Sequence, residues 1–419
     1  MYDLTALGKN SKLASKKLSN TTEQQRNLAL NLCAKKLREN KEFLKQENSF
    51  DVALAKEKGM SDAFIDRLML TDKVIDGMAE GLEQVAQLTA PLNQVVYSHE
   101  NEFQGIKIVK KTVPFGVIGI IYESRPNVTA DAFALCFKTA NAVILKGGSD
   151  SLRSNVAIVK VIKQGLNESG ITADAIALIE DTSRQTTTEF MKMNKYVDLL
   201  IPRGSASLIK SALENATMPI IETGTGNCHV YVDESANVQM SANVIFNAKT
   251  QRYSVCNACE SLVIHANVLQ KALPEIANML KTKQVEIRCD ERSYDVIKDY
   301  PYLAKATDED FYTEYGGAII SVKTVDNIDE AIDHINEHGT GHSESIITEN
   351  SDNAVKFMNE VDASSVYHNA STRFTDGFVF GLGAEIGIST QKLHARGPMG
   401  LSALVTHKYF IEGDGAVRK

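Results

Sequence analysis

The N-terminal part of the chain carries hydrophobic positions at the spacing of an α-helix. Leu28, Leu30, Leu32 and then Leu37 stand between Lys- and Glu-rich stretches. A stripe of this kind predicts amphipathic helices whose apolar side packs inward and whose charged side faces water. We therefore expect residues 10–90 to form a layer of helices.

From Pro114 the pattern changes to short apolar runs separated by helical stretches. The run Val117–Ile121 is unbroken, as in strands that are buried on both faces of a sheet. Further strands are predicted at 142–145, 175–179, 197–201 and 219–221, with helices at 130–140, 151–165 and 185–193 and another that ends near residue 215. Because strands and helices alternate, we expect a parallel sheet with helices on both faces and ligands at the carboxyl ends of its strands.

A second alternating set begins at residue 229 and predicts a second α/β domain. Its strands are predicted at 229–232, 260–264, 284–288, 318–322, 345–348 and 364–367, and its helices at 238–249, 267–281, 327–336 and 352–360. Three further stretches, 95–97, 105–109 and 403–410, have the pattern of strands but belong to neither set. Strand edges of this kind are usually covered by a partner, so we expect a symmetric oligomer.

Length and composition narrow the class of protein. A chain of 419 residues is longer than one hydrophobic core usually serves, so two or three domains are expected. The net charge of −8 argues against a nucleic-acid surface, and no apolar run is long enough to span a bilayer. The six cysteines are scattered and the Lys-rich start lacks the apolar core of a signal peptide, so we expect a cytoplasmic protein without a disulfide framework.

Small and charged residues collect just after the predicted strands of the first sheet. Glu123–Asn127 follows the first strand, Lys146–Ser149 the second, Pro202–Ser205 the fourth and Glu222–Gly226 the fifth. Two of these loops combine a cation with Gly and Ser and lead into a helix, which suits a phosphate group held by backbone N–H groups. The alternative is that they are tight turns that need glycine. No G-x-G-x-x-G or G-x-x-x-x-G-K-[ST] motif is present at these turns, so a nucleotide site here has another form.

Cys256 lies on a polar stretch between a predicted helix and a predicted strand. Cys33 and Cys136, by contrast, lie within apolar helical stretches. Lys249 and Arg252 are close to Cys256 in sequence and would favour a thiolate. The C-x-x-C that Cys256 forms with Cys259 is a weak sign of a metal or redox site, because no second Cys or His pair stands at metal spacing. We expect Cys259 to lie in the core.

A group of histidines is the second candidate for a metal site. His334, His338 and His342 are spaced four apart, as ligands on one helix face would be. Gly339 and Gly341 interrupt that helix, so we expect no metal site.

Several of these features occur in a fixed order along the chain. They are a Pro-x-Gly-Val strand at 114–117, Lys146, Gly204-Ser205, the turn Glu222-x-Gly224, and Cys256 on a loop 34 residues after Glu222. In this order and at this spacing they resemble the aldehyde dehydrogenase superfamily.

Longer strings make the resemblance narrower. They are Val117–Ala132, Leu145–Ser149, Ile201–Gly204, Glu222–His229, Asn247–Arg252, Val255–Ala258 and Leu393–Leu401. Over nearly the whole chain they are similar to the γ-glutamyl phosphate reductase family within that superfamily. Two departures stand out. Tyr253-Ser254 replaces the Pro-Gly usual in these reductases, and Arg125 stands near the place of the oxyanion-binding asparagine of other aldehyde dehydrogenases.

The resemblance implies a reaction and the residues that perform it. It implies reduction of L-glutamyl 5-phosphate by NADPH, with Cys256 forming a thioester and Glu222 at the position of the family's catalytic base. NADP(H) is implied over NAD(H), because Ser149 stands where NAD-preferring members often carry a glutamate. The implied cofactor-binding residues are Lys146, Gly148, Ser149, Arg203, Gly204, Ser205, Gly224 and Glu314, and the implied substrate-binding residues include Arg125 and Asn127.

Four residues after the last predicted strand of the second domain are further substrate-binding candidates. Asn369, Ser371, Thr372 and Arg373 are placed to hold the substrate's α-carboxylate and amine, but the alternative is a loop built of turn-forming residues. Two alternatives remain for the whole chain: a hydrolytic or CoA-acylating aldehyde dehydrogenase, and a non-catalytic protein that kept the fold. The reductase-like strings argue against the first, and the intact Cys256 against the second.

We therefore expect an α/β protein with an aldehyde dehydrogenase-like fold. It would combine a Rossmann-type parallel-sheet cofactor domain, a second α/β catalytic domain and a small β oligomerisation element. The expected segments are a helical part of the cofactor domain (1–94), oligomerisation strands (95–113), the cofactor-binding α/β domain (114–226), the catalytic domain (227–375), a return segment (376–400) and an oligomerisation strand with a tail (401–419). A homodimer or homotetramer is expected, with the glutamate 5-kinase of the same pathway as a further candidate partner and no nucleic acid, membrane or metal.

Overall fold

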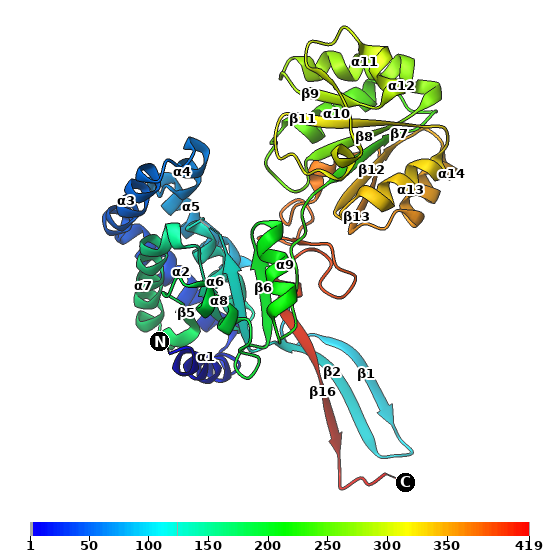
Figure 1. Cartoon of the computed structure of the whole chain (residues 1–419). Helices are drawn as coiled ribbons and strands as arrows, with labels where there is room; N and C mark the ends of the chain where they lie inside the picture. Colours follow the sequence, from blue (N-terminus) through cyan, green and yellow to red (C-terminus); the bar gives the residue numbers. More distant parts are fainter. Residues whose placement is uncertain (1–2, 124, 419) are drawn as a thin grey trace. The chain divides into compact units, whose positions relative to one another are not determined.

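The computed structural model describes residues 3–123 and 125–418, which divide into two compact units (Figure 1). Unit 1 comprises residues 1–222, 382–387 and 399–419, and unit 2 comprises residues 223–381 and 388–398. The division at 222/223 lies a few residues before the expected boundary at 226/227, and both units share the expected return segment 376–400. The roles assigned to the segments stay predictions.

Helices form the N-terminal layer of unit 1, as the hydrophobic spacing predicts. They are α1 (Leu4–Leu18), α2 (Glu23–Glu39), α3 (Lys41–Glu57), α4 (Asp62–Leu68) and α5 (Asp72–Gln87). Four of them begin after a side chain that accepts a backbone N–H of the first turn, namely Asp3, Thr22, Ser61 and Thr71. Such caps satisfy donors that have no partner within the helix, so the sequence itself fixes where these helices start.

A four-stranded parallel sheet forms the centre of unit 1. Its strands are β3 (Val117–Tyr122), β4 (Ala142–Lys146), β5 (Ile176–Leu178) and β6 (Leu199–Arg203), in the order β5-β4-β3-β6. Helices α6 (Asn127–Lys138), α7 (Leu152–Glu168), α8 (Arg184–Phe190) and α9 (Ala206–Asn215) alternate with them. Every residue of β3 and β4 is buried, which explains their unbroken apolar sequences.

The strand predicted at 219–221 is wrong as a full strand. The structure has only an isolated parallel bridge there, between Leu200 and Ile220. The Leu200 N–H donates to the Pro219 carbonyl and the Ile221 N–H donates to the Leu200 carbonyl. Pro219 has no N–H to extend the ladder, and the chain leaves unit 1 after Glu222.

The three strands predicted outside the alternating sets form one antiparallel sheet in unit 1. β1 (Val95–Asn101) pairs with β2 (Ile106–Pro114), and β2 pairs with β16 (Val405–Gly413). Nearly all of β1 is exposed, including Val95, Val96 and Tyr97. These strands are confirmed, whereas their role in oligomerisation stays a prediction.

Unit 2 is built on a seven-stranded parallel sheet with the order β10-β9-β11-β8-β7-β12-β13. The strands are β7 (Cys228–Val232), β8 (Cys259–His265), β9 (Glu286–Cys289), β10 (Leu303–Lys305), β11 (Ile319–Val325), β12 (Ser343–Ile347) and β13 (Ser365–His368). A two-stranded antiparallel sheet, β14 (Ile388–Ser389) with β15 (Gly397–Pro398), also belongs to this unit. The short edge strand β10 and this small sheet were not predicted.

Helices cover both faces of the large sheet. They are α10 (Val238–Thr250), α11 (Ala266–Lys281), α12 (Glu291–Tyr294), α13 (Ile328–His338) and α14 (Ser351–Glu360). One core cluster packs α10 and α11 against the sheet through residues such as Ile245, Leu273 and Leu262, and a second packs α13 and α14 through Ile335, Phe357 and Tyr231. Consecutive residues of one strand, such as Val230 and Tyr231, therefore pack into the cores on opposite faces of the sheet.

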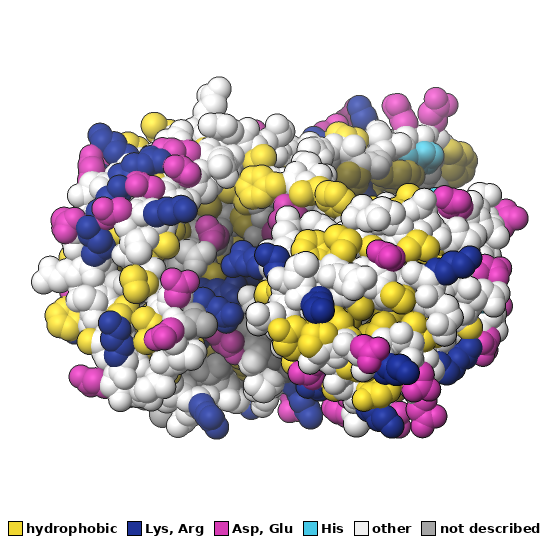
Figure 2. Space-filling model, turned by 90° about the horizontal axis from the view of Figure 1, so that it is seen from above, with side chains coloured by type: hydrophobic (Ala, Val, Ile, Leu, Met, Phe, Trp, Pro, Cys, Tyr) yellow, Lys and Arg dark blue, Asp and Glu magenta, His cyan; other side chains and the backbone are white. Residues whose placement is uncertain are grey.

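On the face that Figure 2 draws, acidic and basic side chains are interspersed with hydrophobic groups. In the described part of the chain, no helix combines the length and the apolar sequence that crossing a membrane requires.

Candidate active site

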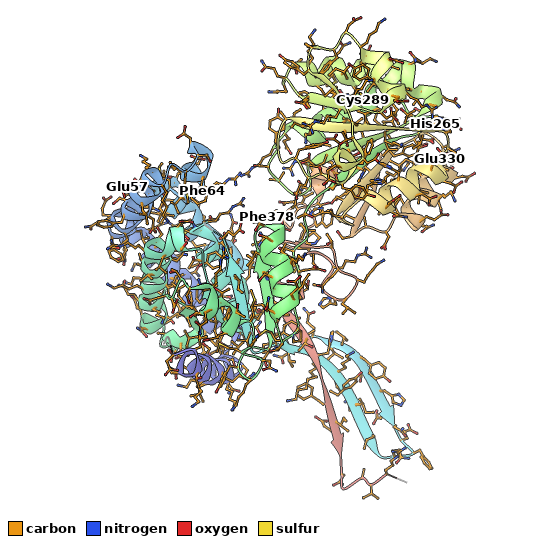
Figure 3. The ribbon with its side chains drawn as sticks, viewed as in Figure 1. Glu57, Phe64, His265, Cys289, Glu330 and Phe378 are labelled. Carbon is orange, nitrogen blue, oxygen red and sulfur yellow. The ribbon has the colours of Figure 1, made fainter. Side chains whose placement is uncertain are left out.

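Cys256 lies on the loop between α10 and β8, at the amino-terminal edge of the unit 2 sheet. The starts of β7 and β8 meet there, because Cys228 and Cys259 are register partners. His265, labelled in Figure 3, ends β8 and so marks the opposite edge. Cys256 is half-buried, whereas the five other cysteines, all in the described ranges, are buried. Its thiol is thus the one that a substrate can reach from solvent.

The backbone of Gly226 packs directly behind Cys256. A Cβ built on Gly226 would lie 1.6 Å from the Cys256 carbonyl oxygen and 2.5 Å from its Cα, so no side chain fits there. The Cys228 thiol donates a hydrogen bond to the same carbonyl at 3.1 Å. The segment that leads into β7 therefore forms the support on which the cysteine loop rests.

Asn257 anchors the other side of the cysteine loop. Its side-chain N–H donates to the Thr375 carbonyl at 2.9 Å, and its own carbonyl accepts from the Thr372 hydroxyl at 2.7 Å. Asn257, Thr372 and Thr375 are all buried. Buried hydrogen bonds of this kind restrict the loop to one conformation, because breaking them would leave polar groups unsatisfied away from water.

A buried polar chain continues from these contacts beneath the loop. The Thr375 hydroxyl lies 2.6 Å from the Ser343 hydroxyl and 2.6 Å from that of Tyr367, and Ser343 lies 2.8 Å from His342 Nδ1. Burial lowers the pKa of His342 to about 4, so its ring is neutral near pH 7. The chain positions the loop without placing a charge below the nucleophile.

Arg373 supplies the positive charge near Cys256. Burial lowers the pKa of Arg373, a negative charge on Cys256 raises it, and the neighbouring Arg252 guanidinium lowers it. Because the attraction is mutual, the guanidinium favours the thiolate form of Cys256. Arg373 Nε also donates to the side chain of Gln251 at 3.0 Å, which holds it beside the loop.

Lys249 forms a buried ion pair near the cysteine loop, and its effect on the Cys256 thiolate stays a prediction. Its side chain is fully buried, and its Nζ pairs with Glu260 at 2.5 Å. Burial raises the pKa of Glu260 to about 7, and the Lys249 charge acts in the opposite direction. Lys249 therefore serves a buried ion pair at the start of β8.

The four candidate substrate residues after β13 do not stay together. Asn369 has a left-handed backbone (φ 55°), and its side chain bonds both backbone groups of Thr348, just past the end of β12. This position is at the carboxyl edge of the sheet, whereas the Cys256 loop is at the amino-terminal edge, so Asn369 forms a structural turn and its assignment to the substrate stays a prediction. Ser371 and Thr372 are buried, and Ser371 accepts the Arg373 N–H. Thr372 contacts the cysteine loop through its hydroxyl, and Arg373 lies beside the loop through its guanidinium.

Glu314 reaches the same region from the segment before β11. Its carboxylate accepts the N–H of Gly226, which lowers its pKa, although burial around the carboxyl outweighs this and raises it. The structure thus brings Glu314, Gly226 and Cys256 into one cluster within unit 2. Its contact with a nicotinamide ribose stays a prediction.

Lys146, Gly148 and Ser149 lie where β4 turns toward α7 in unit 1. Lys146 is buried and its Nζ donates to the Gly147 carbonyl at 3.2 Å. Burial lowers the pKa of Lys146, and the Asp181 charge opposes this. Ser149 is exposed at the start of a 3-10 turn, and the next residue, Asp150, pairs with Lys58 at 3.0 Å.

The loop after β6 binds the side-chain carboxylate of Glu123. Ser205 donates its backbone N–H and its hydroxyl to Glu123 Oε1, at 3.0 and 2.7 Å. Gly204 makes room for this carboxylate. Burial raises the pKa of Asp131 to about 6, although the Asn127 hydrogen bond and the Arg203 charge act in the opposite direction. The donors predicted for a phosphate are therefore present, and a carboxylate occupies them.

The remaining candidate residues lie at the start of α6 and at the division between the units. Arg125 is exposed, and its backbone N–H donates to the Glu123 carbonyl at 2.7 Å, while Ser124 between them lies outside the described residues. Asn127 donates to Asp131 at 3.2 Å. Glu222 is half-buried at the end of unit 1.

Gly224 has a packing reason to be glycine. A Cβ on Gly224 would lie 2.5 Å from the Thr390 hydroxyl, and its N–H donates to the Ile388 carbonyl at 3.3 Å. Its assignment to the cofactor stays a prediction, since close packing against the small β14–β15 sheet already accounts for it.

The histidines do not assemble a metal centre. α13 ends at His338 with Gly339 as its C-cap, so His334 and His338 stack on the helix while His342 opens the approach to β12. Across the ranges 3–123 and 125–418, no group of three or more His, Cys, Asp or Glu side chains is arranged to hold a metal ion.

Comparison with known proteins decides the family. The model of the aldehyde dehydrogenase family matches residues 3–296 and 304–385. γ-Glutamyl phosphate reductases from Caldicellulosiruptor saccharolyticus and Lachnospira eligens are 52% identical over 420 residues and 53% identical over 419 residues, with 100% of each chain covered. This chain belongs to the γ-glutamyl phosphate reductases of the aldehyde dehydrogenase family.

The solved structures agree with this family. The crystal structure of a γ-glutamyl phosphate reductase from Thermotoga maritima is 45% identical, covers 100% of both chains and has a TM-score of 0.97. The aldehyde dehydrogenase-like fold and the reductase family expected from the sequence are therefore confirmed.

One departure from the usual reductase sequence has a visible consequence. Tyr253, where this family usually has proline, packs its ring against the core cluster beneath α10 and α11. The neighbouring Ser254 is exposed. A large apolar side chain thus ties the first half of the cysteine loop to the core.

Proposed function

We propose that this reductase converts L-glutamyl 5-phosphate and NADPH to L-glutamate 5-semialdehyde, phosphate and NADP, the second step of proline biosynthesis from glutamate. The observation that carries the proposal is the half-buried Cys256 on a rigidly supported loop beside the Arg373 guanidinium. The names of the 52–53% identical relatives support the choice of substrate.

The covalent step follows from the chemistry of a thiolate. Sulfur of Cys256 attacks the acyl carbon of the substrate, a C–S bond forms, and the C–O bond to the phosphate breaks with phosphate as the leaving group. Arg373 stabilises the thiolate before attack, and Gly226 and Asn257 keep the sulfur in position. A backbone N–H near Cys256 is proposed to hold the oxyanion. Release of the aldehyde returns sulfur to the thiolate state.

The residues of unit 1 fit the phosphates and ribose of a nicotinamide nucleotide. The Ser205 N–H and hydroxyl already hold an anionic oxygen at the start of α9, as they would hold a diphosphate oxygen. Lys146 lies at the carboxyl end of β4, where it would reach a ribose, and Arg203 and Gly204 complete the set. NADPH, when bound, supplies the hydride that reduces the thioester.

We expect Lys146→Ala to impair use of NADPH far more than use of NADH. Ser149 carries no charge, and the acid next to it in sequence, Asp150, is paired with Lys58, so the turn favours an added 2′-phosphate. Loss of a charged hydrogen-bond donor should raise KM for NADPH by about tenfold or more. The measurement is steady-state kinetics with both cofactors, with Lys210→Ala, on the exposed side of α9, as the control. Equal use of both cofactors by the wild type would contradict the assignment.

Phosphate dependence distinguishes a reductase from a hydrolase. We expect oxidation of glutamate 5-semialdehyde to require inorganic phosphate or arsenate, because phosphate is the acceptor that releases the thioester. Glu222→Gln should retain far more activity than a variant without Cys256, since no water needs activation. NADPH formation is followed with and without phosphate. Rapid phosphate-free formation that Glu222→Gln abolishes would mean a hydrolytic enzyme, and a requirement for CoA in place of phosphate would mean an acylating one.

Free thiols and exposed strand edges bear on the cellular setting. All six cysteines are free thiols, which suits a reducing compartment such as the cytoplasm. The exposed β1 and β16 edges suit a homodimer or homotetramer. Contact with the glutamate 5-kinase is proposed because a labile acyl phosphate has to pass from one enzyme to the other.

A further inference from the structure

Glu123 makes an unusual contact for a residue at the end of a central strand. It follows β3 directly, and its side chain bends across to the start of α9 in the neighbouring connection. One oxygen, Oε1, accepts both the backbone N–H and the hydroxyl of Ser205. The Ser205 hydroxyl also lies 3.0 Å from that of Ser207, which fixes its orientation.

Gly204 allows the carboxylate to approach this closely. A Cβ on Gly204 would lie 2.6 Å from the carboxyl carbon of Glu123 and 2.8 Å from Oε1. The N-terminus of the ten-residue helix α9 carries the positive end of the helix dipole, which attracts an anion. Gly204, the two Ser205 donors and the helix dipole thus form an anion-binding site, and the Glu123 carboxylate occupies it.

We propose that Glu123 is an internal anion that occupies the cofactor's diphosphate subsite at the start of α9 and has to swing away before the cofactor binds. The inference rests on the proposed function, because it takes this subsite to be that of the cofactor. One N–H and one hydroxyl cannot serve two anionic oxygens together, and like charges at this separation repel. The Glu123 side chain is exposed, so solvent is open to it once it is displaced.

Displacing Glu123 costs the same free energy whether NADPH or NADP binds. Glu123 therefore weakens the binding of NADPH and NADP to the same degree and shortens the time for which NADP stays bound after the reaction. A residue that lowers affinity uniformly raises KM and speeds product release.

The test is direct titration of the full-length protein with NADPH, followed by NADPH fluorescence. Glu123→Gln keeps an acceptor oxygen for Ser205 but removes the negative charge. We expect its Kd for NADPH to fall by about three- to tenfold, from the lost dipole attraction and the lost repulsion. Inorganic pyrophosphate should compete with NADPH more strongly in this variant than in the wild type.

Two matched variants complete the experiment. Glu214→Gln makes the same charge change near the other end of α9, where the side chain is exposed, and should leave the Kd unchanged. Ser205→Ala in the Glu123→Gln background removes a donor from the subsite and should weaken NADPH binding, whereas in the wild type it also loosens the competing Glu123 carboxylate. If Ser205→Ala weakens binding in the Glu123→Gln background but Glu123→Gln alone does not strengthen it, the inference about Glu123 is wrong. If Ser205→Ala has no effect in the Glu123→Gln background, or the wild type does not bind NADPH, the proposed cofactor subsite itself fails.

Discussion

Replacement of Cys256 by alanine is expected to abolish turnover while leaving the fold intact. The thiol is the atom that bonds to the acyl group, and no other side chain of the described cysteine loop replaces it. We expect kcat to fall by more than about a hundredfold, as for other deleted covalent nucleophiles. The measurement is NADPH consumption with the acyl phosphate, together with a thermal melt that shows an unchanged Tm.

Cys259→Ala is the matched control for that variant. Cys259 lies three residues later, is fully buried at the start of β8, and donates its thiol hydrogen to the Ser261 carbonyl. It should retain most of the activity, with a modest loss of stability from the small cavity. A Cys256→Ala variant that keeps more than about a hundredth of the wild-type rate would remove the thioester from the mechanism.

Gly226→Ala is expected to be nearly as damaging as loss of the thiol, although it removes no chemical group. The added methyl would overlap the Cys256 carbonyl, so the cysteine loop has to shift. A displacement of about 1 Å at a reacting atom costs about a hundredfold in rate. Activity and the rate at which iodoacetamide alkylates Cys256 measure the effect.

Gly317→Ala serves as the control, because its added methyl would come no closer than 3.7 Å to a neighbouring atom. We expect near-normal alkylation and activity for this variant. Wild-type kinetics in Gly226→Ala would show that the loop is not held by the contact with the segment before β7. Loss of folding in Gly226→Ala is separated from loss of positioning by its thermal melt.

Most of the framework was predictable because the two larger sheets are parallel and buried. Strands such as Val117–Tyr122 and Cys228–Val232 are covered on both faces, so their sequences are mostly apolar and stand out from the helices around them. The sequence was less informative at edges. β10 has only three residues and is half-exposed, and Pro219 interrupts the hydrogen bonding that a fifth strand of unit 1 needs.

The candidate site was predicted in part. Cys256 stands out because its segment is polar, but the groups that support it are the Gly226 backbone, the Asn257 side chain and the Thr375 carbonyl, whose contacts join residues far apart in the chain. The partner of Lys249 could not be predicted, because closeness in sequence does not show where a side chain points, and the structure pairs it with Glu260. Glu123 and Ser205 were both within recognised loops, yet nothing in their spacing indicates that one caps the other.

The interleaving of the two units also constrains the order in which a nascent chain can complete its structure. Unit 1 includes residues 399–419, whose strand β16 forms the third strand beside β2, and the Asn141 side chain donates to the Leu404 carbonyl at 2.8 Å in a buried position. All of unit 2 is therefore synthesised before unit 1 can complete its fold. Until then β2 presents an unpaired backbone edge, which other chains can join. Emergence of residues 399–419 from the exit tunnel is thus the event that lets unit 1 complete its fold.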